Sequence, residues 1–557
     1  MKIFLKGNLL ILAAILLLGL LLRAVFINNS PPSLYGDELT ITLDAYALLK
    51  TGHDQLGNFL PLTFPMGAGR PAGYIYGTIP FVALFGPTAI GVRILSILSG
   101  VGIIFFLYLI GKKLFSKKVG LLTAFIGAVS PWDISLSRGG FEAHFALFLS
   151  LLGIYMFIEA KKSPVYYLFS ALSFGLTFYT YPTYKVSLLL FLPLLLWFQG
   201  ARDILSNGKK YFLVGISFLL VLGMLSLSQT FITCFKLQEV RCNLTIIGGS
   251  ETRFSDINIL SQGKLKNAIE QKINSERQIS NLPKNLIKYF HNKPVEYSKI
   301  LIENYLQNFS MDFLFLHGDR NPRHNMGTIG GLYVIEIILL IIGILTFWEK
   351  SRKIILFLLL WIIIAPIPTA IVDFPHALRS SFMLPPLIII SALGLITLLN
   401  HRNKITLSII FFLFFIQFLF FIQKLYFLAP NEYSSFWSYP AKLASKIATE
   451  NKDKYDYVIL SDRINDIEFA YPVYSKIDPV AVIAQNKERS DLINYPMKKF
   501  GNVFIGFIAE RELLKFINSL PGSTLYIGTK AEGEHLSDYE VIKSLNKEVV
   551  LVLKRKP

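Results

Sequence analysis

Blocks of apolar residues recur along most of the chain, separated by short polar segments. The blocks run for roughly 17–22 residues, about the length that an α-helix needs to cross the hydrocarbon core of a bilayer. The pattern predicts eleven membrane-spanning helices, at about residues 8–27, 89–111, 119–132, 141–160, 164–181, 185–200, 211–229, 329–348, 354–371, 381–399 and 405–427. The first block is too long and too rich in Leu for a secretory signal, and no small-residue cleavage site follows it, so we expect it to be retained.

The pattern changes after about residue 428. A helical start at 440–450 is followed by short runs rich in Val, Ile, Tyr and Phe, with one more helical pattern among them. The runs lie at 455–462, 503–510, 524–530 and 548–555, and the helical pattern lies at 511–520. The sequence therefore predicts two domains, a membrane module over 1–428 and a small α/β domain over 429–557. The second shows no motif of a catalytic or metal site, and we expect it to be accessory.

Composition places the chain among polytopic membrane proteins and excludes an ordinary soluble globule. Of its 557 residues 53% are hydrophobic, and the mean hydropathy is +0.50, which is more apolar than soluble domains usually are. The formal net charge of +18 requires no nucleic-acid partner, because Lys and Arg residues beside membrane spans set the topology and face anionic lipid headgroups.

The basic residues also orient the predicted helices. They fall in alternate loops if eleven spans are present, and by the positive-inside rule these loops are cytoplasmic. The residues are Lys2, Lys6, Lys112, Lys113, Lys117, Lys118, Lys161, Lys162, Arg202, Lys209, Lys210, Lys350, Arg352, Lys353, Arg402 and Lys404. We therefore expect an integral multi-pass protein of the plasma membrane with a cytoplasmic N-terminus. The loops at about 28–88 and 230–328 and the C-terminal domain would be extracytoplasmic.

Both cysteines of the chain lie at the start of the second large outer loop. Cys234 and Cys242 are eight residues apart, so they could close a small disulfide loop in an oxidising compartment. Two separate free thiols fit the sequence equally well, and no spacing typical of a zinc site is present.

Two adjacent acids, Asp37 and Glu38, follow the first predicted span by about ten residues. Asp37 is a candidate general base that would take the proton from an acceptor hydroxyl, and Glu38 a neighbour that would position the acceptor or pair with a cation. The alternative is a helix N-terminus, where acids are favoured by the helix dipole. The dipeptide alone does not decide between the two.

A second group of ionisable residues lies at the outer end of the fourth predicted span. Glu142 and His144 enter the span there, and ionisable residues at the mouth of a span are costly enough to indicate function. Arg138, four residues earlier, could instead neutralise Glu142 locally. Because all three residue types gather at one span end, we favour a site role.

Cations that could hold a phosphate are more scattered. Arg93 lies just inside the second predicted span, and Arg379 begins the tenth, three residues after His376. Arginine suits a phosphate because its planar fork donates two hydrogen bonds at once. The alternatives are snorkelling to the interface or a structural salt bridge. We favour these alternatives for Lys185 and Arg320, and a functional role for Arg93 and Arg379.

Together these residues resemble the GT-C superfamily of integral membrane glycosyltransferases, most of all the branch of protein O-mannosyltransferases and lipid A aminoarabinose transferases. The resemblance is strongest over about 1–200, where an outer loop opening with Asp37-Glu38 is followed by the interfacial stretch 69–86 and by Arg93. Arg138 with Glu142, and Arg379 before Pro385-Pro386, are also similar to the family. The chain departs from it at 70–72, where a Pro-Pro pair is common, and in the unrecognised loop 230–328.

The resemblance implies a function and roles for these residues. The donor would be a polyprenyl-phosphate-linked monosaccharide, and Asp37 the base that gives inversion at the anomeric carbon. Glu38 and Arg93 would lie at the acceptor and phosphate site, and Arg379 would contact the donor phosphate. No cofactor or metal is expected. The acceptor, a protein, a lipid or a cell-wall glycan, stays open.

Two rivals belong to other functional classes. A flippase or transporter of lipid-linked sugars would share the spans and the basic contacts, but internal repeats and broken midplane helices would be expected, and the sequence shows no repeat. A ligase that uses diphosphate-linked oligosaccharide is the other alternative. The ionisable residues lie at outer span ends, which favours chemistry at the membrane surface.

Overall fold

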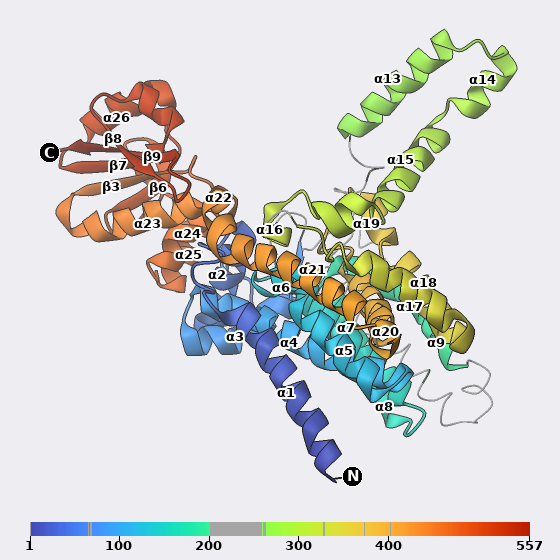
Figure 1. Cartoon of the computed structure of the whole chain (residues 1–557). Coiled ribbons are helices and arrows are strands. Elements are labelled where there is room, and N and C mark those ends of the chain that lie inside the picture. Colours follow the sequence, from blue (N-terminus) through green and yellow to red (C-terminus); the bar gives the residue numbers. More distant parts are fainter. Residues whose placement is uncertain are drawn as a thin grey trace.

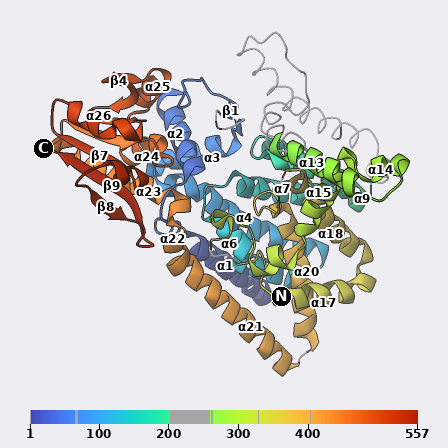
Figure 2. The same cartoon turned by 90° about the horizontal axis from the view of Figure 1, so that it is seen from above.

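The computed structural model describes residues 2–64, 66, 69–200, 215, 259, 263–326, 329–372, 374–401 and 403–557. Apolar helices form a bundle, and a mixed α/β domain built from the C-terminal residues lies at one end of it (Figure 1). Viewed from above, this domain lies on the opposite side of the molecule from a hairpin-like arm (Figure 2). The arm consists of α13 (Gly263–Ile279), α14 (Lys284–Phe290) and α15 (Lys293–Gln307).

The helices of the bundle follow the apolar blocks of the sequence. They are α1 (Lys2–Ala24), α4 (Ala89–Leu114), α5 (Lys117–Val129), α6 (Pro131–Ser137), α7 (Glu142–Glu159), α8 (Val165–Phe178), α9 (Pro182–Gln199), α17 (Glu336–Lys350), α18 (Arg352–Ile364), α19 (Ile367–Val372), α20 (Leu384–His401) and α21 (Lys404–Gln423). Their termini coincide with those of the predicted spans to within a few residues in most cases.

The expected count of eleven spans is not confirmed. Within the described residues six stretches are long and apolar enough to cross a membrane: Ala89–Leu114, Glu142–Glu159, Pro182–Gln199, Arg352–Val372, Ser381–His401 and Lys404–Glu432. A seventh results if α5 and α6, bent by 58°, count as one span. Asn8–Ala24, Gly73–Phe85 and Val165–Phe178 are apolar but shorter, and the predicted span 211–229 lies almost wholly outside the described residues, as do Cys234 and Cys242. These helices make the chain a multi-pass membrane protein.

The bend between α5 and α6 has a local cause. Ser130 is extended, and its hydroxyl accepts a hydrogen bond from the amide of Asp133, which starts a new helix. Pro131 occupies the first position of that helix, where it has no amide to leave unpaired. The span predicted at 119–132 is therefore a helix that ends and restarts.

Short elements connect the bundle helices. Between α1 and α4 lie α2 (Gly36–Thr51), a two-stranded ribbon of β1 (Thr63–Phe64) and β2 (Arg70–Pro71), and α3 (Gly73–Phe85). The later connections contain α13 (Gly263–Ile279), α14 (Lys284–Phe290), α15 (Lys293–Gln307), η1 (Asp312–Leu316), α16 (Pro322–Asn325), η2 (Ser381–Met383), η3 (Lys424–Leu428), α22 (Ala429–Glu432) and η4 (Ser434–Trp437).

The C-terminal residues form a seven-stranded sheet in the order β4-β5-β6-β3-β7-β9-β8. The central strand β3 is parallel to β6 and β7, and the other pairs are antiparallel. The elements are α23 (Tyr439–Asn451), η5 (Lys452–Lys454), β3 (Tyr457–Ser461), α24 (Ile467–Tyr474), α25 (Pro479–Lys487), β4 (Ser490–Leu492), β5 (Tyr495–Phe500), β6 (Val503–Gly506), η6 (Glu510–Glu512), α26 (Leu513–Ser519), β7 (Thr524–Thr529), η7 (Ala531–His535), β8 (Glu540–Lys543) and β9 (Val549–Lys556). The four predicted strands and two predicted helices are all present. Helices α24 and α25 and strands β4, β5 and β8 were not predicted.

The sheet domain packs against α2, the helix that carries Asp37 and Glu38. Buried apolar residues of α2, among them Leu39 and Ile41, share one hydrophobic core with Ala444, Val458 and Ile467 of the C-terminal domain. Helices α24 and α25 pack against α2 in Figure 1. The position of α2 therefore depends on the C-terminal domain as well as on the bundle.

Candidate active site

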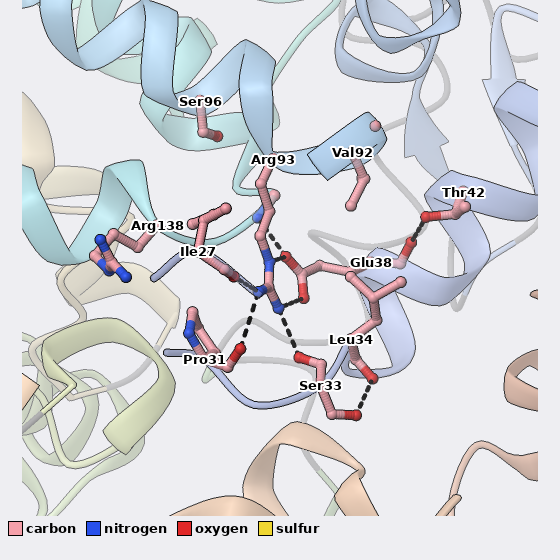
Figure 3. A network of polar contacts seen from close by, with 12 residues as sticks. Ile27, Pro31, Ser33, Leu34, Glu38, Thr42, Val92, Arg93, Ser96 and Arg138 are labelled. Carbon is pink, nitrogen blue, oxygen red and sulfur yellow. Dashed lines mark hydrogen bonds and ion pairs between the residues drawn. The ribbon is translucent and has the colours of Figure 1, made fainter. Parts of the chain in front are cut away.

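Glu38 and Arg93 form a buried ion pair between α2 and α4 (Figure 3). Both side chains are fully buried. Arg93 Nε and Nη2 donate to the two carboxylate oxygens of Glu38 at 2.7 and 2.8 Å, and the amide of Gly140 donates to Glu38 Oε1 at 2.8 Å. A buried pair of this kind is tolerated only when its remaining donors and acceptors are satisfied.

The other N–H groups of Arg93 are bound to the backbone. Nη1 donates to the carbonyls of Ile27 and Pro31 at 2.9 and 3.1 Å, and Nη2 donates to the carbonyl of Ser33 at 2.6 Å. All five donors of the guanidinium thus have partners inside the protein, and none is left for a phosphate. The geometry gives Arg93 and Glu38 a positioning role, because together they fix the loop before α2 and the first turn of that helix.

Asp37 has a different partner from its neighbour. Its Oδ1 accepts a hydrogen bond from Arg70 Nη2 at 2.7 Å, and Arg70 Nε lies 2.8 Å from Glu142 Oε1. Arg70 Nη1 also donates to the hydroxyl of Thr40 at 2.7 Å. One buried guanidinium thus joins two carboxylates, one at the start of α2 and one at the start of α7.

Exposure separates the three acids. The side chain of Asp37 is 34% exposed, against 11% for Glu142 and 0% for Glu38. Oδ2 of Asp37 makes no hydrogen bond with any described residue. Asp37 is therefore the most exposed of the three acids, and Arg70, which also contacts Glu142, holds its Oδ1.

Burial and charge fix the protonation states beside Asp37. Burial raises the pKa of Tyr35 well above its ordinary value, and the charges of Asp37 and Glu142 raise it further. Burial alone would lower the pKa of Arg70, but Glu142 and Asp37 outweigh it and hold that pKa above its ordinary value. Tyr35 therefore stays a neutral phenol, and Arg70 stays a cation.

Arg138 and His144 belong to a second buried network, at the end of α1. Arg138 donates only to backbone carbonyls, those of Leu22, Arg23, Val25 and Ser30. His144 Nε2 lies 2.9 Å from Asp133 Oδ1, and Asp133 is ion-paired with Arg23. Arg138 thus does not neutralise Glu142. The contacts of Arg138 and His144 indicate that both side chains stabilise the packing of the helices around the end of α1.

The structure places the remaining predicted residues in the segment that leads into α20. The partly buried Arg379 makes no hydrogen bond or ion pair with any described residue. Of Arg93, Arg138 and Arg379, it is the one whose donors have no partner among the described residues. His376 lies beside Asp319 and His324. Arg320, for which a structural role was favoured, stacks on Phe374 with its guanidinium carbon 4.6 Å from the ring centroid.

A loop connects this segment with the start of α2. The ring centroid of His324 lies 5.5 Å from that of Phe141, which lies 5.9 Å from that of Tyr35. The guanidinium of Arg323 lies 4.9 Å from the centre of the Tyr35 ring. Residues 319–326 thus lie between the His376–Arg379 segment and the helix that carries Asp37.

Sequence reasoning missed Arg70, Asp319 and His324. Arg70 lies in the same predicted outer loop as Asp37, and a basic residue in that loop could have indicated a partner for the acid. In the sequence, however, residues 70–72 stood out only as a departure from the family. Asp319 and His324 occur in a polar cluster, but nothing in the sequence shows that His376, about 50 residues later, lies beside them.

Comparison with known proteins gives one family match. Residues 71–226 match the family model described as dolichyl-phosphate-mannose-protein mannosyltransferase. No curated protein matches the chain. The matched segment contains Arg93, Arg138, Glu142 and His144 and begins just after Arg70.

Solved structures of low identity also align with the chain. The oligosaccharyltransferase AglB of Archaeoglobus fulgidus, tethered to an acceptor peptide, aligns at 14% identity with a TM-score of 0.49, over 84% of this chain and 63% of that protein. The chain thus spans less than two thirds of AglB. ArnT of Cupriavidus metallidurans bound to undecaprenyl phosphate aligns at 12% identity with a TM-score of 0.44, over 98% of both chains. On the family match over 71–226, the resemblance of the chain to the GT-C membrane glycosyltransferases is confirmed.

Proposed function

We propose that the protein is an inverting glycosyltransferase that moves a monosaccharide from a polyprenyl-phosphate donor to an acceptor hydroxyl at the extracytoplasmic face of the membrane. The observation that carries the proposal is the geometry of Asp37, a reachable carboxylate held by a buried arginine that is itself bound to a second acid. The mannosyltransferase family match over 71–226 supports the class of reaction.

In the proposed reaction Asp37 acts as the general base. Its Oδ1 is held by Arg70, so Oδ2 faces the acceptor and takes the hydroxyl proton. The acceptor oxygen forms a bond to the anomeric carbon while the bond from that carbon to the phosphate oxygen breaks. The electron pair of the broken bond leaves with the polyprenyl phosphate, and attack from the opposite side inverts the anomeric carbon.

The departing phosphate needs a cation, and Arg379 is our candidate. Its guanidinium has no partner among the described residues, whereas those of Arg93 and Arg138 are fully occupied by the protein. A charge-assisted contact from Arg379 would stabilise the negative charge that develops on the phosphate. With this contact, we expect no divalent metal to take part in the transfer itself.

The roles of the two adjacent acids can be separated by one pair of variants. Asp37→Asn removes the base from a partly exposed position, so transfer should be lost while the melting temperature changes little. Glu38→Gln leaves Arg93 buried without its counter-charge, which should cost about 3 kcal/mol of stability. Asp453→Asn, an exposed acid of the sheet domain, is the control that should change neither. Normal turnover by Asp37→Asn would remove the proposed base.

Mass spectrometry of lipids retained by Asp37→Asn, purified gently from native membranes, tests the donor. An enzyme without its base should hold the donor without consuming it. A polyprenyl monophosphate carrying one sugar supports the proposal and identifies the sugar. A diphosphate-linked oligosaccharide would instead favour the ligase or the flippase. The acceptor would then be sought among proteins, lipids and cell-wall glycans supplied to the wild-type enzyme.

A further inference from the structure

Three potential metal ligands converge beside the loop that contacts Tyr35. Asp319 Oδ2 lies 2.8 Å from His324 Nδ1 and 3.8 Å from His376 Nδ1. One ligand atom from each residue lies within 4.8 Å of the other two. The two imidazole rings are tilted toward each other, with centroids 4.5 Å apart. The cluster thus joins a loop after α15 to the segment before α20.

The carboxylate at the centre of this cluster is held in a fixed orientation. Oδ1 of Asp319 accepts a hydrogen bond from the amide of Asn321 at 2.8 Å, and Oδ2 accepts one from the amide of Ala377 at 2.7 Å. The side chain of Asn325 donates to the carbonyl of Asp319 at 2.6 Å. Supporting hydrogen bonds of this kind orient the ligands of metal sites.

The burial of the group also suits a bound ion. The side chains of Asp319 and His324 are 4% and 6% exposed, while that of His376 is 22% exposed and leaves a path from solvent. A cavity of about 10 Å³ adjoins Asp319 and His324, which is about the smallest space that accepts a water. The group therefore offers three protein ligands and room for a small fourth one.

We propose that Asp319, His324 and His376 form a binding site for a divalent transition-metal ion of the zinc type. Two imidazoles and one carboxylate are a ligand set that zinc accepts, with bonds of about 2.0–2.2 Å, whereas magnesium and calcium prefer oxygen ligands alone. Two ligands on such an ion lie roughly 3.3 Å apart. The distances from Asp319 Oδ2 to the nitrogens of His324 and His376, 2.8 and 3.8 Å, lie on either side of this value.

The bound ion would fasten two segments that are separate in the sequence. His376 lies three residues before Arg379, and His324 packs on Phe141 beside Tyr35. The ion would therefore fix the segment carrying Arg379 against the loop that contacts the start of α2. This role is structural and lies apart from the transfer step, so the site does not depend on the proposed function.

Metal binding can be measured directly on the full chain, carrying an affinity tag without histidines. The protein is stripped with a chelator in detergent micelles, and Zn²⁺ is then titrated with the bound metal counted by mass spectrometry. Co²⁺ provides an optical reading of the ligand geometry. The variants are His376→Ala, which removes the most exposed ligand, and His317→Ala, which changes a neighbouring histidine. His317 is 72% exposed, and its side chain pairs with Asp312 alone among the described residues.

We expect about one Zn²⁺ per wild-type chain, an intense four-coordinate Co²⁺ spectrum, and a higher melting temperature with Zn²⁺ than without it. His317→Ala should behave like the wild type. His376→Ala should bind Zn²⁺ at least about tenfold more weakly than the wild type. The proposal fails if the wild type takes up no stoichiometric Zn²⁺, or if both variants lose binding equally. Melting temperatures of the stripped variants show whether both are folded.

Discussion

Arg70 contacts two carboxylates at once, and the distance between α2 and α7 at this point depends on it. Replacing it with Ala removes the guanidinium that contacts Glu142 and releases Oδ1 of Asp37. Misplacing a catalytic group by about 1 Å can lower the rate about a hundredfold, so we expect a fall in kcat of that order for Arg70→Ala. Arg70→Lys keeps the charge but loses the planar fork of donors, so its kcat should lie between those of the wild type and Arg70→Ala.

Steady-state kinetics with a lipid-linked sugar donor would measure this effect. Lys185→Ala serves as the control, since a cation at the start of α9 should alter kcat little. A fall for Arg70→Ala that appears only in KM for the donor would instead assign Arg70 to donor binding and contradict the positioning role.

A second residue, Asp44, should make the stability of the folded protein depend on pH. It lies two turns after Asp37 in α2, and burial raises its pKa to about 7. The folded state thus binds a proton that the unfolded state has released above about pH 4. The contribution of this proton to the free energy of unfolding is fully present below about pH 4. It is lost as the pH rises to about 7, by at most about 1.4 kcal/mol per pH unit.

Asp44→Asn should remove that loss, because an amide carries no charge at any pH and its oxygen can still accept from the Gln55 amide. Melting temperatures of the two proteins should agree at pH 4.5 and diverge at pH 8, with the variant more stable. Parallel curves across this range would show that Asp44 is ionised in the folded protein.

At the scale of elements, the contact between α2 and α24 couples the sheet domain to the candidate base. A side chain at Gly36 would place its Cβ 2.6 Å from Asp466 Oδ1, and the Ser438 hydroxyl holds the other oxygen of Asp466. Gly36→Ala should therefore push α24 away, cost about 1–3 kcal/mol and lower the activity. Asp466 has a φ of 65°, so Asp466→Gly is tolerated by the backbone and removes the clash.

A double-mutant cycle measures this coupling. The pair Gly36→Ala and Asp466→Gly should recover much of the stability and activity lost by Gly36→Ala alone. Additive losses would mean that the two positions do not meet in solution. If stability recovers but activity does not, the side chain of Asp466 has a role of its own in the site.

The elements also show where sequence reasoning succeeds. Strands β3, β6, β7 and β9 are buried and rich in branched apolar residues, so their pattern is visible. Strands β4 and β8 are short and largely polar, and β5 carries Pro496 and two lysines, so no apolar run marks them. The span at 119–132 was located, but its bend at Ser130-Pro131 was not.

The sequence predicted which types of residue form the site, but not which acid pairs with which arginine. Asp37 and Glu38 are adjacent, yet successive helical residues point about 100° apart, which sends one toward Arg70 and the other toward Arg93. Both arginines lie tens of residues away, and only the packing of α2 against α3 and α4 decides which acid each one meets. The cluster of Asp319, His324 and His376 is hidden for the same reason.

At the scale of the whole molecule, the sheet domain and α2 must lie on one side of the membrane, because they share a core. Glu159, at the far end of α7 from Glu142, pairs with Lys113 and Lys162. Basic residues thus gather at the end of the bundle away from the sheet domain. By the positive-inside rule we expect this end to be cytoplasmic and the sheet domain to lie outside.

Cysteine labelling in intact cells tests this orientation. With Cys234 and Cys242 replaced by Ser, a single cysteine is placed at Asp453 of the sheet domain or at Lys161 between α7 and α8, both exposed positions. A membrane-impermeant maleimide should label Asp453→Cys in intact cells, and Lys161→Cys only after the membranes are opened. The reverse pattern would put Asp37 in the cytoplasm, where the donor would have to be a lipid-linked sugar of the inner leaflet. Because α2 and the sheet domain move together, this one measurement places the proposed base as well.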